Sequence, residues 1–527
     1  MSPAARSTLR VLSDLAVLAV WIACAVAFAA HQEIWVDETT QLSGLTLGFS
    51  EVADWLTGTR ADRFGVPDDR MPPLSYWVGS VWASWFGLGA SSLRALGITA
   101  TCGTLLFVMA AARRAFGGSA ALIAGLALAF SPNTIVAGIE IRAYPLFLLA
   151  SAAAFYFLVR LHAADARSTR GAWLGLAIAC GACVGTHFFG VVLSGAVLLA
   201  AACQTWLRRE RPVGLVGAGL CVIASVVFIL PFVRAAAATS EPETGGEGIL
   251  RDFARLAYRL LGGHPSVSVH SLVKLGVLGG AGVALVVSLA RALTAPTLRR
   301  LLARAVGAGG LVAIACRLVV RSFDSLSPSY NLWMLPPIAL LIGASISSTR
   351  PRWRALAWLG VTLHLAGTAA GAIVLLSHGP TFAHTAAERI AERIVKARTS
   401  EGRFAVVHDS TESWGHTYLP LRYLFGKDLP QYLARAGADG TFTIAELPDL
   451  ERSSAPADLP FDKIVVVHTQ KQDAEAIREA LQAARGPLIP ATQAMEALRR
   501  AGWTLEDQEV LAAMEATRLE WMRRAKR

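Results

Sequence analysis

The chain has 527 residues, of which 54% are hydrophobic and only 17% are charged. Soluble globular proteins have about 25% charged residues, so this composition predicts a protein that lies in lipid over most of its length. The formal net charge of +11 does not indicate nucleic-acid binding, because the arginines cluster in short loops between apolar segments, as they do in membrane proteins. The composition therefore argues against a soluble protein and against a nucleic-acid-binding protein.

The seven cysteines all lie in apolar segments, so we expect no disulfide framework in the polar C-terminal part of the chain. Cys180 and Cys183 form a Cys-x-x-Cys pair in the interior of an apolar helix. Small-residue packing explains this pair better than a redox site or a zinc site does.

The first apolar segment, residues 10–30, is long enough to cross a bilayer, and we interpret it as a retained transmembrane helix and not as a signal peptide. Asp37 and Glu38 follow this segment, at the point where it would leave the membrane. Charge beside a bilayer costs free energy, so the two carboxylates are a candidate acid/base centre. The alternative is an ordinary solvated loop.

An amphipathic pattern and a double proline come next. In residues 45–58 apolar side chains recur at helical spacing with acidic residues between them, which predicts a helix at the membrane surface. Pro72 and Pro73 cannot sit inside a helix, so they predict a rigid entry into the aromatic-rich helix that follows.

Further apolar segments extend to residue 377 and, with the first, predict about eleven membrane spans. They occupy about 92–112, 118–133, 142–160, 172–186, 188–207, 213–233, 270–290, 301–320, 330–348 and 355–377. Arginines fill alternate loops between them, which under the positive-inside rule makes those loops and the N-terminus cytoplasmic. The Asp37–Glu38 loop and everything after Leu376 then face outward.

Several outward loops carry polar side chains, and we expect these to converge at the outer leaflet. They are Arg70, Glu140, Arg142, Tyr144, His187, Arg251, Arg255, Arg259, His264, Arg317, Arg321, Ser329 and Tyr330. Arg142 at the mouth of a helix suits a lipid phosphate, and a partly desolvated Asp37 suits a general base. The structural alternatives are a snorkelling cation for Arg142, core packing or a backbone hydrogen bond for His187, and a structural ion pair for Glu140 with Arg142.

From about residue 384 the composition becomes that of a water-soluble domain. Residues 404–407 and 464–467 are predicted to form buried strands, and residues 472–485, 492–501 and 506–525 are predicted to form helices. The fold class that we predict is a polytopic α-helical membrane protein, residues 1–380, followed by an extracytoplasmic α/β domain, residues 381–527.

Four short motifs, in this order and topology, resemble those of the GT-C superfamily of membrane glycosyltransferases. Residues 35–38 (Trp-Val-Asp-Glu) resemble its first-loop acidic motif, and residues 71–77 (Met-Pro-Pro-Leu-Ser-Tyr-Trp) resemble its His-Pro-Pro-Leu-Tyr-Tyr segment. Residues 126–144 are similar to its third loop, and residues 186–190 (Thr-His-Phe-Phe-Gly) to its Thr-His-Tyr-x-Gly motif. The resemblance is to the bacterial family 39 group, related to protein O-mannosyltransferases and lipid A aminoarabinose transferases. It is firm over residues 30–200, looser to about 345 and weak beyond.

The resemblance implies an inverting transferase that moves a sugar from a polyprenyl-phosphate donor to a glycan, lipid or protein acceptor at the outer face of the cytoplasmic membrane. By motif match, Asp37 is the base, Glu38 its companion and Arg142 the ligand of the donor phosphate. The other candidate substrate-binding residues are Arg70, Glu140, Tyr144, His187, Arg321 and Tyr330. Met71 replaces the usual histidine before Pro-Pro, and Ser329 precedes Tyr330 where relatives carry Arg-Tyr, so both departures concern contacts to the donor phosphate.

Neighbouring residues in an extended segment point to opposite sides, so we expect Asp37 and Glu38 to have different tasks. The pair lacks a third ligand nearby in sequence, so we expect no cofactor and a metal-free mechanism, with a divalent cation as the alternative. Two other functions are compatible with the sequence: a transporter, and a non-catalytic scaffold with an outward α/β binding domain. No internal repeat supports the transporter.

Overall fold

The computed structural model divides into two compact units. The first, the helical unit, comprises Met1–Ala30, Gly48–Arg60 and Asp69–His378, and the second, the sheet unit, comprises His31–Leu47, Ala61–Asp68 and Gly379–Arg527. The structure describes residues 3–60, 69–163, 169–238, 249–263, 271–294, 298–319, 326–347, 350–377, 386–398, 403–408, 417–426, 428–436, 442–446, 453–455, 458–470, 493–512 and 516–524.

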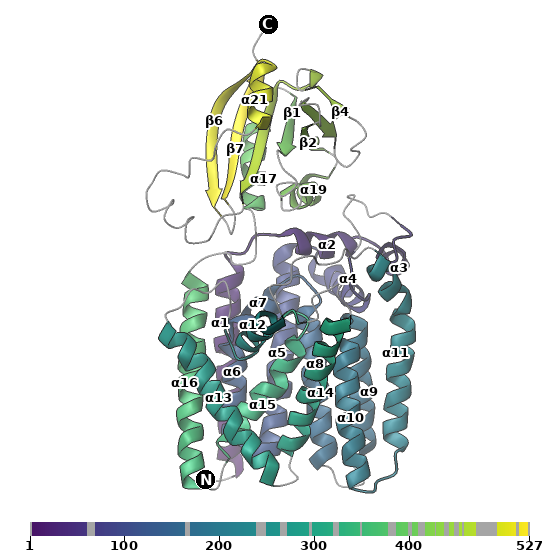
Figure 1. Cartoon of the computed structure of the whole chain (residues 1–527), viewed down its shortest axis with the longest axis vertical. Helices are drawn as coiled ribbons and strands as arrows, with labels where there is room; N and C mark the ends of the chain where they lie inside the picture. Colours follow the sequence, from purple (N-terminus) through teal and green to yellow (C-terminus); the bar gives the residue numbers. More distant parts are fainter. Residues whose placement is uncertain are drawn as a thin grey trace. The chain divides into compact units, whose positions relative to one another are not determined.

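The helical unit is a bundle of α-helices (Figure 1). Its described helices are α1 (Pro3–Ala29), α3 (Phe49–Leu56), α4 (Leu74–Phe86), α5 (Ala90–Phe116), α6 (Gly118–Ala129), α7 (Pro132–Ile139), α8 (Tyr144–Ala163), α9 (Thr169–Thr186), α10 (Gly190–Leu207), α11 (Val213–Ala238), α12 (Ile249–Leu260), α13 (Ser271–Thr294), α14 (Leu298–Val319), η2 (Leu332–Met334), α15 (Leu335–Ser345) and α16 (Pro351–Ser377). The predicted polytopic helical architecture is confirmed.

Seven of the described helices are long and apolar enough to cross a membrane: α1, α5, α8, α10, α11, α13 and α16. The pair α6 and α7 would add an eighth span, but it bends by 65° at a break between the two helices. Pro132 begins α7 and cannot continue the hydrogen bonding of α6. The estimate of about eleven spans is therefore not confirmed, because α9, α14 and the short α15 do not meet the same criterion among the described residues.

Two helix contacts near the predicted outer loops depend on glycine. A Cβ atom at Gly97 of α5 would lie 2.5 Å from the backbone oxygen of Gly138 of α7, so the two helices touch through their backbones. A Cβ atom at Gly190 would collide with the backbone of Cys183, which keeps the turn between α9 and α10 tight. Small residues of this kind allow close helix packing where lipid supplies no hydrophobic driving force.

The predicted entry helix is confirmed as α4. Pro73 is its N-cap, so both prolines precede the helix and neither interrupts it. The predicted amphipathic helix over residues 45–58 is shorter than expected, since α3 begins at Phe49, where Glu51 caps the helix by accepting from the Gly48 amide.

The sheet unit contains a seven-stranded sheet in the order β4-β3-β2-β1-β5-β7-β6. Its described strands are β1 (Phe404–His408), β2 (Gln431–Ala436), β3 (Phe442–Glu446), β4 (Ser453–Ser454), β5 (Lys463–Gln470), β6 (Trp503–Ala512) and β7 (Ala516–Arg524). β1 pairs in parallel with β2 and β5, and the other pairs are antiparallel.

Apolar clusters cover both faces of this sheet, as an α/β fold requires. One cluster packs α17 (Ala387–Arg398) and α19 (Leu419–Phe425) against β1 and β5, and the other packs α21 (Gln493–Arg500) against the same strands. The predicted strands at 404–407 and 464–467 and the helix at 492–501 are confirmed. The predicted helix at 472–485 lies outside the described residues.

The prediction of a helix over residues 506–525 is wrong, because this segment forms most of the β6–β7 hairpin. Its composition is rich in helix-forming Glu, Leu, Met and Arg. The antiparallel pairing of β7 with the buried strand β5, from Lys463–Arg523 to Gln470–Ala516, overrides that propensity and buries Leu519 and Met522.

Candidate active site

Arg142 and Asp69 form a buried ion pair in the helical unit. Nη1 of Arg142 lies 3.2 Å from Oδ2 of Asp69, and their side chains are only 8% and 7% exposed. The Tyr76 hydroxyl donates to the same oxygen at 2.6 Å. Burying a carboxylate is costly unless a cation and hydrogen-bond donors compensate for the lost water, and Asp69 has both. Arg142 is thus held in a defined position between α7 and α8.

The sequence supplies this arrangement from two distant segments. Asp69 directly precedes the Met-Pro-Pro motif, and α4 then presents Tyr76 one turn into the helix. Tyr76 is fully buried and packs edge-on against Trp55 of α3 at 5.6 Å. Sequence reasoning missed Asp69. Its position next to a motif already singled out is the signal that could have revealed it.

His187 lies in the turn between α9 and α10, enclosed by aromatic rings. Phe147 stacks on it at 4.9 Å, and Tyr330 and Tyr144 lie at 5.3 Å and 5.9 Å. The Phe189 amide donates to Nδ1 at 3.1 Å, so Nδ1 is unprotonated and Nε2 carries the hydrogen. Nε2 is buried and has no hydrogen-bond partner among the described residues.

Burial, reinforced by the positive charge of Arg142, lowers the pKa of His187 to about 3. The imidazole is therefore neutral at any physiological pH. A neutral ring with an unused N–H is a hydrogen-bond donor and not a proton shuttle. The structural alternative, a hydrogen bond to backbone, is present at Nδ1 but leaves Nε2 to be explained.

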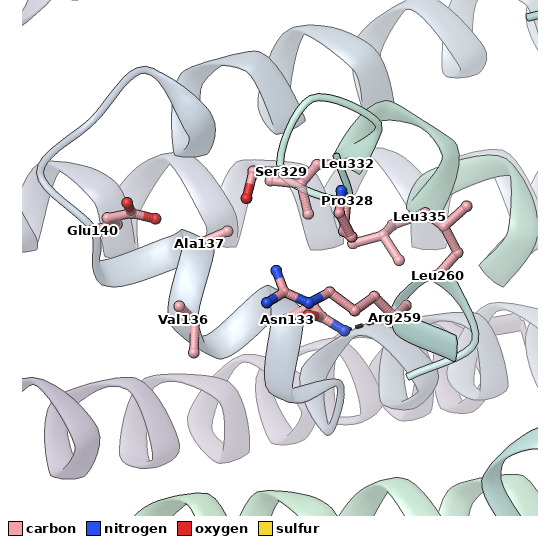
Figure 2. Close-up of a pocket in the computed structure, with 10 residues that line it drawn as sticks. All are labelled: Asn133, Val136, Ala137, Glu140, Arg259, Leu260, Pro328, Ser329, Leu332 and Leu335. Atoms are coloured by element: carbon pink, nitrogen blue, oxygen red, sulfur yellow. Dashed lines mark hydrogen bonds between the residues drawn. The ribbon is translucent and has the colours of Figure 1, made fainter. Parts of the chain in front are cut away.

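A polar pocket lies between α7, α12 and the turn before η2. It is small, with a cavity volume of about 30 Å³, and its polar lining residues are Asn133, Glu140, Arg259 and Ser329. Figure 2 shows the Arg259 side chain extending into this pocket between α7 and the turn that carries Ser329. The Asn133 amide donates to the backbone oxygens of Arg259 and Gly263, at 2.7 Å and 2.5 Å, and so fixes the end of α12.

Arg259 is the cation that lines this pocket, which the carboxylate of Glu140 also lines. Burial and the neighbouring Arg255 lower its pKa to about 10, while Glu140 and Tyr144 oppose the shift. It therefore remains a cation at neutral pH. Its Nε is buried and has no hydrogen-bond partner among the described residues. The sequence had placed Arg259 only in an outward loop, because nothing in one loop shows which of several arginines turns inward.

An apolar groove adjoins the polar pocket at Leu260, which lines both. The groove has about 970 Å³ of unfilled space and runs between α12, α14 and α15. It is lined by Phe253, Leu256, Ala257, Leu260, Leu261, Val306, Gly307, Gly310, Leu311, Ile314, Leu326, Met334 and Ile338. The two cavities together offer an apolar surface next to the half-buried cation Arg259.

The acidic pair lies in the sheet unit, on α2 (Val36–Gly44). Asp37 and Glu38 occupy the first turn of this helix, so the expectation of an extended segment is wrong: successive residues of a helix diverge by about 100°, not 180°. Their environments nevertheless differ, because Glu38 is fully buried and Asp37 is half-buried. The convergence of this pair with Arg142 stays a prediction.

Only some of the other predicted site residues lie together in the structure. Five of them lie near one another in the helical unit, as the ring contacts and electrostatic interactions described above show: Glu140, Arg142, Tyr144, His187 and Tyr330. Arg70 is exposed, and its backbone amide donates to Asp69. Arg321 and His264 lie outside the described residues. No described group of three or more His, Cys, Asp or Glu side chains is placed to hold a metal ion.

Comparison with known proteins adds a family match over part of the chain and a shared fold. Residues 70–230 match the family model described as dolichyl-phosphate-mannose-protein mannosyltransferase. No curated protein matches the chain. ArnT from Cupriavidus metallidurans, bound to undecaprenyl phosphate, has 18% sequence identity and a TM-score of 0.55, with 98% of each chain covered. Its apo form has 17% identity and a TM-score of 0.57 over the same shares.

Identity this low establishes a common fold and no more. The family match covers motifs that lie around Asp69, Arg142 and His187, and the fold extends over nearly the whole chain. The family match over residues 70–230 and the shared fold are both consistent with the resemblance to GT-C glycosyltransferases that the sequence motifs carry.

Proposed function

We propose that the protein transfers a sugar from a polyprenyl-phosphate donor to an acceptor at the outer face of the cytoplasmic membrane, with inversion at the anomeric carbon. The observation that carries this proposal is the apolar groove that meets the polar pocket at Leu260. A polyprenyl-phosphate sugar has a long apolar tail followed by an anionic phosphate, and the cavities present an apolar surface followed by Arg259. ArnT, which shares the fold, binds undecaprenyl phosphate.

Two arginines are proposed to hold the donor phosphate. Arg142 was assigned from its motif, and Arg259 joins it because Arg259 interacts electrostatically with Glu140 and Tyr144, which flank Arg142 in sequence. A guanidinium can bind two phosphate oxygens at once, and such charge-assisted bonds are strong where water is excluded. Asp69 would then keep Arg142 in place, while the His187 Nε2–H is free to donate to an oxygen of the substrate.

Asp37 is proposed as the general base and Glu38 as its orienting partner. Asp37 accepts the proton of the acceptor hydroxyl or amine, the freed lone pair forms a bond to the anomeric carbon, and the bond from that carbon to the phosphate oxygen breaks. Polyprenyl phosphate leaves with the electron pair. A single displacement of this kind inverts the anomeric centre. We propose that it needs no metal, since arginines neutralise the departing phosphate.

The outward orientation rests on the alternation of arginine-rich loops. Reporter fusions after Arg170 and after Arg403 should report the cytoplasmic and the outer side respectively. Reporters on the same side would contradict the orientation and with it the outer-face site.

The central test measures donor binding and sugar transfer with purified full-length protein in nanodiscs. Arg259→Gln should weaken binding of a polyprenyl-phosphate sugar by about tenfold or more, because a charge-assisted hydrogen bond contributes about 1.5–3 kcal/mol. Arg255→Gln is the matched control, since Arg255 is exposed on the same helix one turn away. Equal donor affinities for the wild type and Arg259→Gln would refute the assignment of the pocket.

A further inference from the structure

The helix that carries the acidic pair is held by the C-terminal part of the chain. Residues His31–Leu47 belong to the sheet unit by their contacts, although they directly follow α1 in sequence. α2 itself has only nine residues and no side-chain hydrogen bond at its N-cap, Trp35. Helices shorter than about 12 residues are marginal on their own. The position of α2 must therefore come from its tertiary contacts.

The first contact is a cap at the start of α17. Oε2 of Glu33 accepts from the backbone amides of Glu388 at 3.0 Å and Arg389 at 3.5 Å. Oε1 of Glu33 pairs with Nε of Arg389. Free amides and the dipole at a helix N-terminus favour a carboxylate. Glu33 is only 8% exposed and so is well shielded from solvent.

The second contact is the packing of α2 against α19. α19 belongs to the core of the sheet unit, because Leu421 packs in the same cluster as Val406 of β1 and Ile390 of α17. The short acidic helix is thus connected at both its entry and its body to helices that cover one face of the sheet.

We propose that the sheet unit positions the acidic pair for catalysis, with Glu33 and Arg389 as positioning residues. This inference rests on the proposed function, in which Asp37 is the base. Glu33 precedes Asp37 by four residues, so a shift of its carboxylate is passed on through no more than about 14 Å of chain. Displacement of a reacting group by about 1 Å can cost 10²-fold in rate. The ion pair and cap fix the entry to α2 on that scale.

The test compares variants of the full-length protein in nanodiscs. Glu33→Ala removes the cap and the ion pair, and it should lower kcat about 10- to 100-fold while donor affinity stays unchanged. Glu33→Gln keeps an oxygen that accepts from the two amides and should recover part of the loss. Arg389→Ala should resemble Glu33→Gln, and the double variant Glu33→Ala/Arg389→Ala should be no worse than Glu33→Ala alone.

Arg393→Ala is the matched control. Arg393 lies one turn further along α17 and pairs with Glu509 of β6 at 2.8 Å. It removes a comparable ion pair from the same helix, and we expect wild-type kcat. A loss of kcat equal to that of Glu33→Ala would show a general requirement for domain stability and would overturn the proposal.

Hydrogen exchange supplies a readout that does not depend on activity. In Glu33→Ala the amides of residues 36–44 should exchange faster, while those of β1 and β5 keep their protection. Unchanged exchange in residues 36–44 together with wild-type kcat would overturn the proposal. A wild-type protein with no sugar transfer would refute the proposed function, and the exchange experiment would still decide whether Glu33 holds α2.

Discussion

The two charged parts of the predicted site are supported in different ways. Arg142 is held inside the helical unit by a buried ion pair with Asp69 and by the Tyr76 hydroxyl on the same carboxylate. Asp37 lies on a nine-residue helix of the sheet unit, and contacts of Glu33 with α17 and of α2 with α19 hold this helix in place. The proposed phosphate-binding arginine is thus held within the bundle, whereas the proposed base belongs to the sheet unit.

This difference suggests a division of labour. In the proposed reaction, the groups that bind the donor are rigid before the donor arrives, because unpaired charges inside a membrane protein are costly and the fold satisfies them. The proposed base instead takes a proton from the acceptor. It lies on a segment that belongs to the sheet unit, so the two tasks would fall to different units.

Removal of the base should have the largest effect. Asp37→Asn should lower kcat by about 10²–10⁴-fold with donor affinity unchanged, since loss of a general base typically costs that much. Glu38→Gln should cost less, because an orienting partner does not accept the proton. Transfer of a labelled sugar from a lipid-linked donor measures both. Full activity of Asp37→Asn would reverse the assignment, and loss of wild-type activity on chelation would favour a metal.

Breaking the Arg142–Asp69 pair separates stability from binding. Arg142→Ala leaves a buried carboxylate uncompensated and should destabilise the helical unit by about 3–5 kcal/mol. Adding Asp69→Asn should restore much of that stability but not donor binding. Arg142→Lys keeps the charge but loses the planar fork, so donor affinity should fall about tenfold. Unfolding and donor titration measure the two effects. Unchanged donor affinity in Arg142→Lys would indicate that Arg259 alone binds the donor phosphate.

His187 gives a smaller, pH-dependent effect. Its pKa of about 3 lies below the usual value of 6.5, so the unfolded state takes up a proton first as the pH falls. Stability is full above about pH 6.5 and is lost toward pH 3, with about 2 kcal/mol lost at pH 5. His187→Asn keeps an acceptor for the Phe189 amide and should lack this loss.

Unfolding at pH 7 and pH 5 measures the His187 effect. His31→Asn is the control, because His31 is exposed. An equal loss of stability in wild type and His187→Asn would show that this imidazole does not remain neutral in the fold.

Sequence reasoning succeeded where a pattern is long or a motif is specific. The apolar segments became helices because burial in lipid decides their structure over many residues. Short but ordered motifs singled out Glu140, Arg142, Tyr144 and His187, which the fold brings near one another, and their roles stay predictions. The number of spans was less certain, since α9, α14 and α15 are apolar but short or interrupted by charge.

The failures concern interactions between distant residues. Asp69 was missed because its partners Tyr76 and Arg142 come together only in the fold. The segment 506–525 was assigned as helix because local propensity cannot reveal the pairing of β7 with β5. The helical form of α2 was missed because a nine-residue helix held by other elements carries little periodic signal.

The apolar groove affects which concentration of the donor controls the rate. A polyprenyl chain partitions into the bilayer, because each buried CH₂ group contributes about 0.8 kcal/mol. A groove lined by apolar side chains would therefore receive such a chain from lipid and not from water. The enzyme would then respond to the number of donor molecules per area of membrane. Diluting vesicles at a fixed ratio of donor to lipid should leave the rate per enzyme unchanged, while adding donor-free lipid to the same membranes should slow it.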